Sequence, residues 1–325
     1  MAEQIKRLLS RRALIAGGAG VLSLNWFRGA HGQRNKSFVL GWLSSTPGPD
    51  SLLEAFHAGL RGLGYLEGSS IRVVARSAQD NSELRVLARE LVRQQVDVLV
   101  TKGRAATRAA QEATATIPVV MAPVDDPYEF VASLSRPTGN ITGLALQQTE
   151  VDAKQLEILK ELVPAISRLA IFYYYGETYY ALESTAHALG VEALWVQIKQ
   201  PQDLDRPFAE ALSKRANGLL IVDTGALGST CSVIADMALA RRIPAAASWR
   251  GDAQTTLLLT YAADEIHLQH RAAFYVDRIL RGAKPEDLPI EQAAKFDLIV
   301  NLKSARELGV TAPPAVILRA NEVID

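Results

Sequence analysis

The chain has 325 residues, 48% of them hydrophobic, with 35 basic and 35 acidic residues. This length suits two domains of ordinary size, each able to bury its own core. The zero net charge and the lack of a basic cluster exclude a nucleic-acid-binding surface, so we expect no nucleic-acid partner. The single cysteine, Cys231, excludes a disulfide within the chain. Among apolar neighbours it is expected to be a core residue rather than a catalytic thiol.

Residues 1–32 have the pattern of an export signal. Basic residues precede an apolar, glycine-rich run from Ala13 to Leu24 that is too short to span a bilayer, and small residues follow before a cleavage site near Gly32. The segment SRRAL from Ser10 favours a twin-arginine signal, and an ordinary Sec signal is the alternative. No cysteine lies near the cleavage site. We therefore expect an exported periplasmic protein that is not a lipoprotein.

The first half of the remaining chain alternates apolar runs with helical patterns. Strands are predicted at 38–43, 71–75, 96–100 and 117–121, and helices at 52–63, 83–93 and 105–113. This alternation predicts an α/β fold with a parallel sheet and right-handed crossovers. The strand that begins at Ile117 is expected to stop at Ala122-Pro123. The segment Gly139–Gly143 is expected to be turn-rich and to lead into the second half.

The second half repeats the plan. Strands are predicted at 169–173, 193–197, 218–222 and 243–246. Helices are predicted at 151–162, 204–215 and 232–240, and a further helix after the first of these strands is predicted to end at Leu189. Leu63-Gly64 and Leu189-Gly190 end corresponding helices, and Ile117-Pro118 and Ile243-Pro244 open corresponding strands at the same offset. This shared register predicts duplicated α/β domains. A long helix is then predicted at 264–281, followed by strands at 296–300 and 316–318 around a helix at 303–308.

Several stretches resemble one protein family. They are IPVVMAPVDDPYEFVASLSRPTGNITGL from Ile117, FHAGLRGLGYLEG from Phe56, QLEILKELVP from Gln155, and most of the chain from Tyr275 to Asp325. The chain is similar there to the ABC-transporter substrate-binding family of the tryptophan/tyrosine type. The resemblance implies a periplasmic binding protein type I fold, in which two doubly wound parallel-sheet lobes enclose a cleft and are joined by a hinge of three chain crossings. We expect lobe 1 at 37–143 plus 260–288, and lobe 2 at 144–259 plus 289–325.

Polar and aromatic residues gather where the predicted strands end, which is where open α/β sheets bind ligands. The predicted ligand-binding residues are Ser44, Ser45, Thr46, Thr101, Lys102, Gly103, Arg104, Asp125 and Asp126 in lobe 1, and Tyr174, Tyr175, Glu177, Asp223, Thr224, Trp249 and Tyr261 in lobe 2. Hydroxyls and helix-start N–H groups suit a carboxylate, an aspartate suits an ammonium group, and aromatic rings offer stacking walls. Any one of these polar residues could instead cap a helix.

Two of these segments depart from the family pattern. Thr101-Lys102-Gly103-Arg104-Ala105 stands where members often have TGGTPAA, and Tyr174 to Thr178 stands where they often have NPANP. Because both changes fall on expected ligand loops, the resemblance does not carry the usual ligand over to this chain. Lys102 and Arg104 would favour an anionic group if they face the ligand.

The sequence lacks the HExxH, GxSxG and cysteine–histidine patterns of common catalytic and metal sites. We expect no catalytic residue, metal or cofactor, and therefore no enzyme. The predicted function is that of the periplasmic solute-binding component of an ABC import system. It would deliver an amino acid or related small carboxylate to a permease in the inner membrane, and it would act as a monomer. The alternatives are a ligand-sensing subunit for a receptor and an enzyme that uses Asp125 or Asp126.

Overall fold

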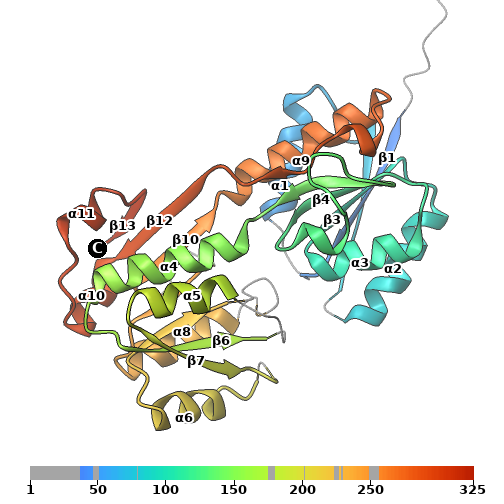
Figure 1. Cartoon of the computed structure of the whole chain (residues 1–325). Helices are drawn as coiled ribbons and strands as arrows, with labels where there is room; N and C mark the ends of the chain where they lie inside the picture. The colour runs from blue at the N-terminus through green and yellow to red at the C-terminus, as the bar shows by residue number, and fades with distance from the viewer. Residues whose placement is uncertain are drawn as a thin grey trace, which may run out of the picture. The chain divides into compact units, whose positions relative to one another are not determined.

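The computed structural model describes residues 37–46, 51–78, 80–174, 180–200, 202–222, 227, 230–248 and 256–325. The predicted export signal, residues 1–32, lies outside this set. The described residues form two β-sheets with helices packed on both faces of each (Figure 1). The predicted α/β class with two lobes is confirmed.

Sheet A comprises, within the described residues, six strands in the order β11-β5-β4-β3-β1-β2. The strands are β1 (Phe38–Ser44), β2 (Ile71–Ser77), β3 (Val98–Lys102), β4 (Val119–Val124), β5 (Ile141–Ala145) and β11 (Glu291–Gln292). Each neighbouring pair is parallel. The carboxyl ends of β1, β3 and β4 therefore lie at one edge of this sheet.

Helices cover both faces of sheet A because alternate strand residues point in opposite directions. Leu40 and Trp42 of β1 pack with α1 (Ser51–Gly62) and α9 (Glu265–Leu280), which lie side by side in Figure 1. Leu43 packs instead with α2 (Asn81–Arg93) and α3 (Arg104–Ala113). Short 3₁₀ turns, η1 (Pro127–Glu129) and η2 (Pro285–Asp287), complete this half.

Sheet B has the order β13-β12-β10-β9-β8-β6-β7 in the part of the chain that the structure describes. Its strands are β6 (Arg168–Tyr173), β7 (Glu192–Gln197), β8 (Gly218–Ile221), β9 (Ala245–Ala247), β10 (Leu259–Ala263), β12 (Phe296–Asn301) and β13 (Glu322–Ile324). β10 and β12 are antiparallel, and the other pairs are parallel.

The helices of sheet B also divide between two faces. Ile171 of β6 packs in the core that includes α4 (Gln148–Leu162), α5 (Tyr180–Ala188), α10 (Leu302–Leu308) and α11 (Pro314–Ile317). Phe172 faces the other way, towards α6 (Asp205–Ser213) and α8 (Thr230–Ala240). Its ring contacts Phe208 of α6 edge-on, with centroids 5.1 Å apart.

The predicted duplication is visible in the hydrogen bonds of the two halves. Gly64 and Gly190 both have positive φ, at 90° and 65°, where the left-handed conformation ends a helix. The carbonyl oxygens of Pro118 and Pro244 each accept a 2.9 Å bond, from Leu99 N and Leu219 N. The paired motifs read from the sequence therefore occupy equivalent positions in sheets A and B.

Two predicted boundaries around β4 are wrong. The strand does not stop at Ala122-Pro123 but continues to Val124, with a shift of register against β5 between Met121 and Val124. A bulge of this kind accommodates proline, which lacks the N–H that a regular ladder needs. The segment Gly139–Gly143 is not a turn throughout, because Ile141–Ala145 forms the buried strand β5.

The predicted strand at 316–318 is also wrong. Pro314–Ile317 forms the short helix α11, and the last strand is β13. Proline at the first helical position has its φ already set for a helix and loses no hydrogen bond there. A short apolar run does not by itself distinguish a strand from a helix.

Two strands lie in a different sheet from the one expected. β10, which includes Tyr261, pairs with β9 and β12 of sheet B, whereas residues from 260 were expected in lobe 1. β11 pairs with β5 of sheet A, whereas residues from 289 were expected in lobe 2. The chain thus passes between the sheets after β5, after β10 and after β11.

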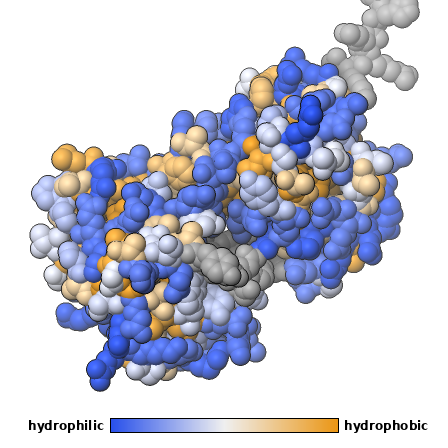
Figure 2. Space-filling view, in the orientation of Figure 1, coloured by the Kyte–Doolittle hydropathy of each residue, from blue (hydrophilic) through white to orange (hydrophobic). Residues whose placement is uncertain are grey.

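Hydrophilic residues cover much of the face drawn in Figure 2, and hydrophobic residues appear between them in small groups. Among the described helices, none is both long enough and apolar enough to cross a membrane. The large apolar side chains are mostly in the cores on either side of the two sheets.

Candidate ligand-binding site

The ends of β1 and β3 meet at the carboxyl edge of sheet A, as the sequence predicts. Ser44 pairs with Lys102 in the strand register. Ser45 then donates from its backbone N and from its Oγ to the carbonyl oxygen of Lys102, at 3.2 and 3.3 Å. Ser44 Oγ accepts from the backbone N of Thr46 at 3.1 Å. Of these residues Ser44 is buried, Ser45 and Lys102 are half-buried and Thr46 is exposed.

Gly103 permits this close approach of the two loops. Its φ is 87°, and a Cβ at this position would lie 2.4 Å from Ser45 Oγ. Gly103 is also the N-cap residue of α3. The backbone conformation therefore favours glycine here, and any larger residue would also force the hydroxyl of Ser45 to rotate away.

Thr101 has a structural partner inside the lobe. Its side chain is fully buried, and its Oγ1 lies 2.8 Å from Thr107 Oγ1 of α3. Thr107 Oγ1 in turn donates to the carbonyl oxygen of Gly103 at 3.1 Å. These contacts join the end of β3 to the first turn of α3, which favours a structural role for Thr101 in this conformation.

The two aspartates that follow β4 are both exposed. Asp126 is the N-cap of η1, and its Oδ1 accepts from Tyr128 N at 2.9 Å. This is the helix-cap alternative that the sequence left open. Asp125 lies directly between β4 and this cap.

Glu129 links the loop after β4 to α3. Its carboxylate forms ion pairs with Arg104 and Arg108, and its side chain is only 12% exposed. Two guanidinium groups thus share one carboxylate, and the three side chains together keep a net positive charge. Because Arg104 is an expected ligand residue, this pairing with Glu129 is the contact that a bound anion would have to share.

The predicted residues of sheet B are only partly described. Tyr175, Glu177, Asp223, Thr224 and Trp249 lie outside the described residues. Tyr174 follows β6, is half-buried, and packs against the core beneath α6 and α8. Its carbonyl oxygen accepts a 3.4 Å bond from the side chain of Gln197.

Tyr261 lies within β10 rather than at a strand end. Its ring stacks on Phe296 of β12, with centroids 5.6 Å apart and planes inclined by 18°. Burial raises the pKa of Tyr261 above its ordinary value, so the hydroxyl stays protonated at neutral pH. The Nε2 of Gln155 donates to the carbonyl oxygen of Tyr261 at 2.6 Å, which ties α4 to β10.

A polar cluster at the start of α4 was missed by the sequence analysis. Gln148 Nε2 donates to Asp152 Oδ1 at 2.7 Å and to Ser248 Oγ at 2.8 Å. Ser248 directly follows β9, at the carboxyl edge of sheet B. A signal was present, because Asp152 and Gln155 are polar residues on the buried side of an otherwise apolar helix face.

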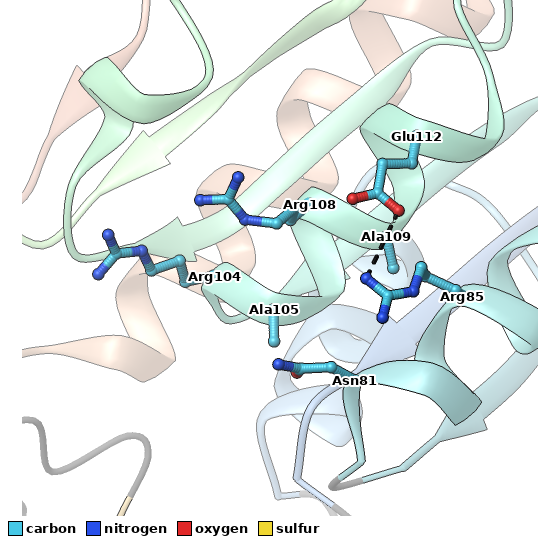
Figure 3. A pocket seen from close by; sticks show the side chains of 7 residues that line it. All are labelled: Asn81, Arg85, Arg104, Ala105, Arg108, Ala109 and Glu112. Atoms are coloured by element: carbon cyan, nitrogen blue, oxygen red, sulfur yellow. Dashed lines mark ion pairs between the residues drawn. The ribbon is translucent and has the colours of Figure 1, made fainter. Parts of the chain in front are cut away.

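A separate hollow of about 220 Å³ lies between α2 and α3. Its lining consists of Asn81, Arg85, Arg104, Ala105, Arg108, Ala109 and Glu112 (Figure 3). Ala105 and Ala109 leave the space open, and Arg85 pairs with Glu112 at 3.8 Å. Both members of that pair are nearly half exposed, so the attraction is strongly screened by solvent.

No group of three or more possible metal-ligating side chains occurs among the residues that the structure describes. The described part of the site offers hydroxyl, carboxylate, guanidinium and aromatic groups near strand ends, and the amide of Gln148 at the start of α4. Such groups suit recognition of a small polar solute by hydrogen bonds and ion pairs.

Comparison with known proteins finds relatives that match most of this chain. A curated tyrosine-binding protein from Clostridioides difficile is 24% identical over 284 residues, which cover 85% of this chain and 81% of that protein. The crystal structure of an ABC domain in complex with L-Trp from Streptococcus pneumonia has a TM-score of 0.82 at 21% identity, and covers 89% of this chain and 100% of that one. A conserved domain protein from Vibrio cholerae has a TM-score of 0.79 at 24% identity, over 88% and 99% of the two chains.

The structural neighbours confirm the predicted periplasmic binding protein type I fold. The family model described as ABC transporter substrate binding protein matches residues 42–324, which is most of the chain. Proteins of this kind bind a solute, so the expectation of a binding protein rather than an enzyme is confirmed. The chain belongs to the family of ABC transporter substrate-binding proteins.

Proposed function

We propose that the chain is the exported, periplasmic binding protein of an ABC importer and that its ligand is an α-amino acid, preferentially an aromatic one. The observation that carries the amino-acid assignment is the match to a tyrosine-binding relative over 85% of the chain. The L-Trp complex with the same fold supports it. A permease in the inner membrane would receive the ligand, and the binding protein would act as a monomer.

We propose lobe limits that follow the observed sheets. One lobe comprises residues 37–145 and 265–292, and the other comprises 148–263 and 296–325. The short segments between them would serve as the hinge on which the lobes close around the ligand. The ligand would lie between the carboxyl edges of the two sheets.

Within this site we keep most of the predicted contacts as proposals. In the first lobe they are Ser45, Thr46, Lys102, Arg104 and Asp125, whose side chains are at least partly exposed at the carboxyl edge of sheet A. Ser44, Thr101, Gly103 and Asp126 would instead shape the loops that carry them. In the second lobe the proposed contacts are Tyr174 and five residues outside the described ranges, namely Tyr175, Glu177, Asp223, Thr224 and Trp249.

Thermal unfolding of the purified protein tests the ligand class. The panel would contain L-tyrosine, L-tryptophan, aliphatic and acidic amino acids, a sugar and a nucleoside. A ligand at a thousand times its dissociation constant stabilises the folded state by about 4 kcal/mol, which raises the melting temperature by several degrees. We expect a shift with aromatic amino acids and none with the sugar or nucleoside. A shift with the sugar alone would contradict the proposal.

Import needs its own measurement. Deleting the gene in its native bacterium is expected to reduce uptake of radiolabelled amino acid at concentrations near the dissociation constant, and the wild-type gene should restore uptake. Unchanged uptake, together with tight binding in vitro, would argue against an importer and favour the sensing role.

A further inference from the structure

The amino end of α4 holds a side-chain amide in a defined orientation. Gln148 is the first residue of the helix, and its Nε2 lies 2.7 Å from Asp152 Oδ1 and 2.8 Å from Ser248 Oγ. A side-chain NH₂ group has two hydrogens. These two acceptors therefore use both donors of the Gln148 amide.

Asp152 decides which way this amide points. Its carboxylate accepts hydrogen bonds and, when ionised, donates none. With the carboxyl of Asp152 ionised, a rotation of the amide by half a turn would bring Gln148 Oε1 against Asp152 Oδ1 without a proton between them. The aspartate thus holds the NH₂ group on its own side, and the amide oxygen becomes the group that Gln148 presents elsewhere.

The burial of the three side chains separates their roles. Asp152 is 1% exposed and Ser248 is 9% exposed, whereas Gln148 is half-buried. Of the three, Gln148 therefore has the side chain most accessible to a solute. When Asp152 is ionised, its bond to the NH₂ group polarises the amide and strengthens the amide oxygen as an acceptor for a cationic donor.

The position of the cluster agrees with ligand binding. Ser248 comes directly after β9, at the carboxyl edge of sheet B, which is the edge where open α/β sheets bind ligands. The same helix is tied to β10 through Gln155. The amide of Gln148 is therefore supported by α4 and by the end of β9.

We propose that Gln148 Oε1 accepts a hydrogen bond from the α-ammonium group of the ligand and that Asp152 is the positioning residue that orients it. This inference rests on the proposed amino-acid-binding function and assigns the residues that distinguish an α-amino acid from the same acid without its amino group. Ser248 supplies the second acceptor that completes the orientation.

The experiment compares two ligands that differ only in the amino group. Dissociation constants are measured by calorimetry for L-tyrosine and for 3-(4-hydroxyphenyl)propanoate, and in parallel for L-tryptophan and indole-3-propanoate. Asp152→Asn replaces the carboxyl with an amide that has an NH₂ group as well as an oxygen, so Gln148 is no longer held in one orientation. We expect it to weaken binding of the amino acids about tenfold or more and to change binding of the des-amino acids less than about twofold.

Two further variants make the result specific. Glu150→Gln removes an exposed negative charge from the same first turn of α4, and it is expected to leave both dissociation constants unchanged. Gln148→Met removes the proposed acceptor and keeps a side chain of similar size at this half-buried position. It should reproduce the selective loss even if Asp152→Asn folds poorly.

The outcomes distinguish recognition of the ammonium group from a merely structural role of these residues. An equal loss for both ligands in Asp152→Asn and Gln148→Met would overturn the inference, because a merely structural role weakens both. No loss for either ligand would overturn it as well. If the wild-type protein binds neither these compounds nor any other amino acid of the thermal-unfolding panel, the proposed function itself fails and this inference fails with it.

Discussion

The side-chain amide of Gln147 donates a 2.6 Å hydrogen bond to the carbonyl oxygen of Ala293, and so joins the segment after β5 to the segment after β11. A backbone bond reinforces this link, because Ala293 N donates at 2.8 Å to the oxygen of Ala145, the last residue of β5. Asp264 N donates to Lys295 O at 3.0 Å, so the segment after β10 is tied in as well. The three passages between the sheets thus form one hydrogen-bonded unit.

Gln147→Ala tests the contribution of this side chain to stability. We expect the free energy of unfolding to fall by about 0.5–1.5 kcal/mol, because a partly buried hydrogen bond is lost. Gln95→Ala is the matched control, since Gln95 also has a left-handed backbone (φ 54°, against 57° for Gln147) but an exposed side chain. Urea denaturation measures both. Equal effects of the two substitutions would show that the bond to Ala293 contributes nothing.

Gly143 lies opposite the irregular part of β4. Its φ is 135°, and a Cβ there would lie 2.3 Å from the backbone oxygen of Met121. Gly143→Ala is therefore expected to destabilise the protein by about 1–3 kcal/mol, since backbone must move to relieve the contact. Gly62→Ala, at the end of α1 with nothing within 4 Å of the added Cβ, should be neutral or slightly stabilising. Thermal melts of the two variants give the comparison.

Phe208 is the main aromatic residue that α6 contributes to sheet B. It is 1% exposed, contacts Phe172, and has the Arg241 guanidinium 4.8 Å from its ring centroid. Phe208→Ala should cost about 3–5 kcal/mol of stability. Leu212→Ala, one turn later and 45% exposed, should stay within about 0.5 kcal/mol of wild type. A similar cost for both in chemical denaturation would mean that the burial of Phe208 is not what stabilises α6.

Cys231 is expected to be chemically inert in the folded protein. Burial raises the pKa of its thiol to about 12, so very little reactive thiolate is present at pH 8. Alkylation by iodoacetamide at pH 8 should be slow, and should become fast in denaturant, where the pKa returns to its ordinary value. Mass spectrometry follows the reaction. Rapid labelling of the native protein would contradict the buried position of Cys231 in α8.

The sequence determined the α/β class and the duplication, because these depend on local periodicity and on turn residues. Gly64 and Gly190 are readable as helix ends, and the apolar strands are short and regularly spaced. The sequence also placed Ser45, Lys102 and Asp125 at strand ends, since that position follows from chain order alone. The resemblance added the family, which the comparison confirms.

Only the tertiary structure decided which groups pair across the fold. The ion pairs of Glu129 with Arg104 and Arg108 and the bond from Gln148 to Ser248 join residues far apart in the chain. No local pattern specifies such pairs, because they depend on how helices pack on a finished sheet. The same holds for β10, whose apolar pattern suits either sheet and whose place is set by hydrogen bonds to β9 and β12.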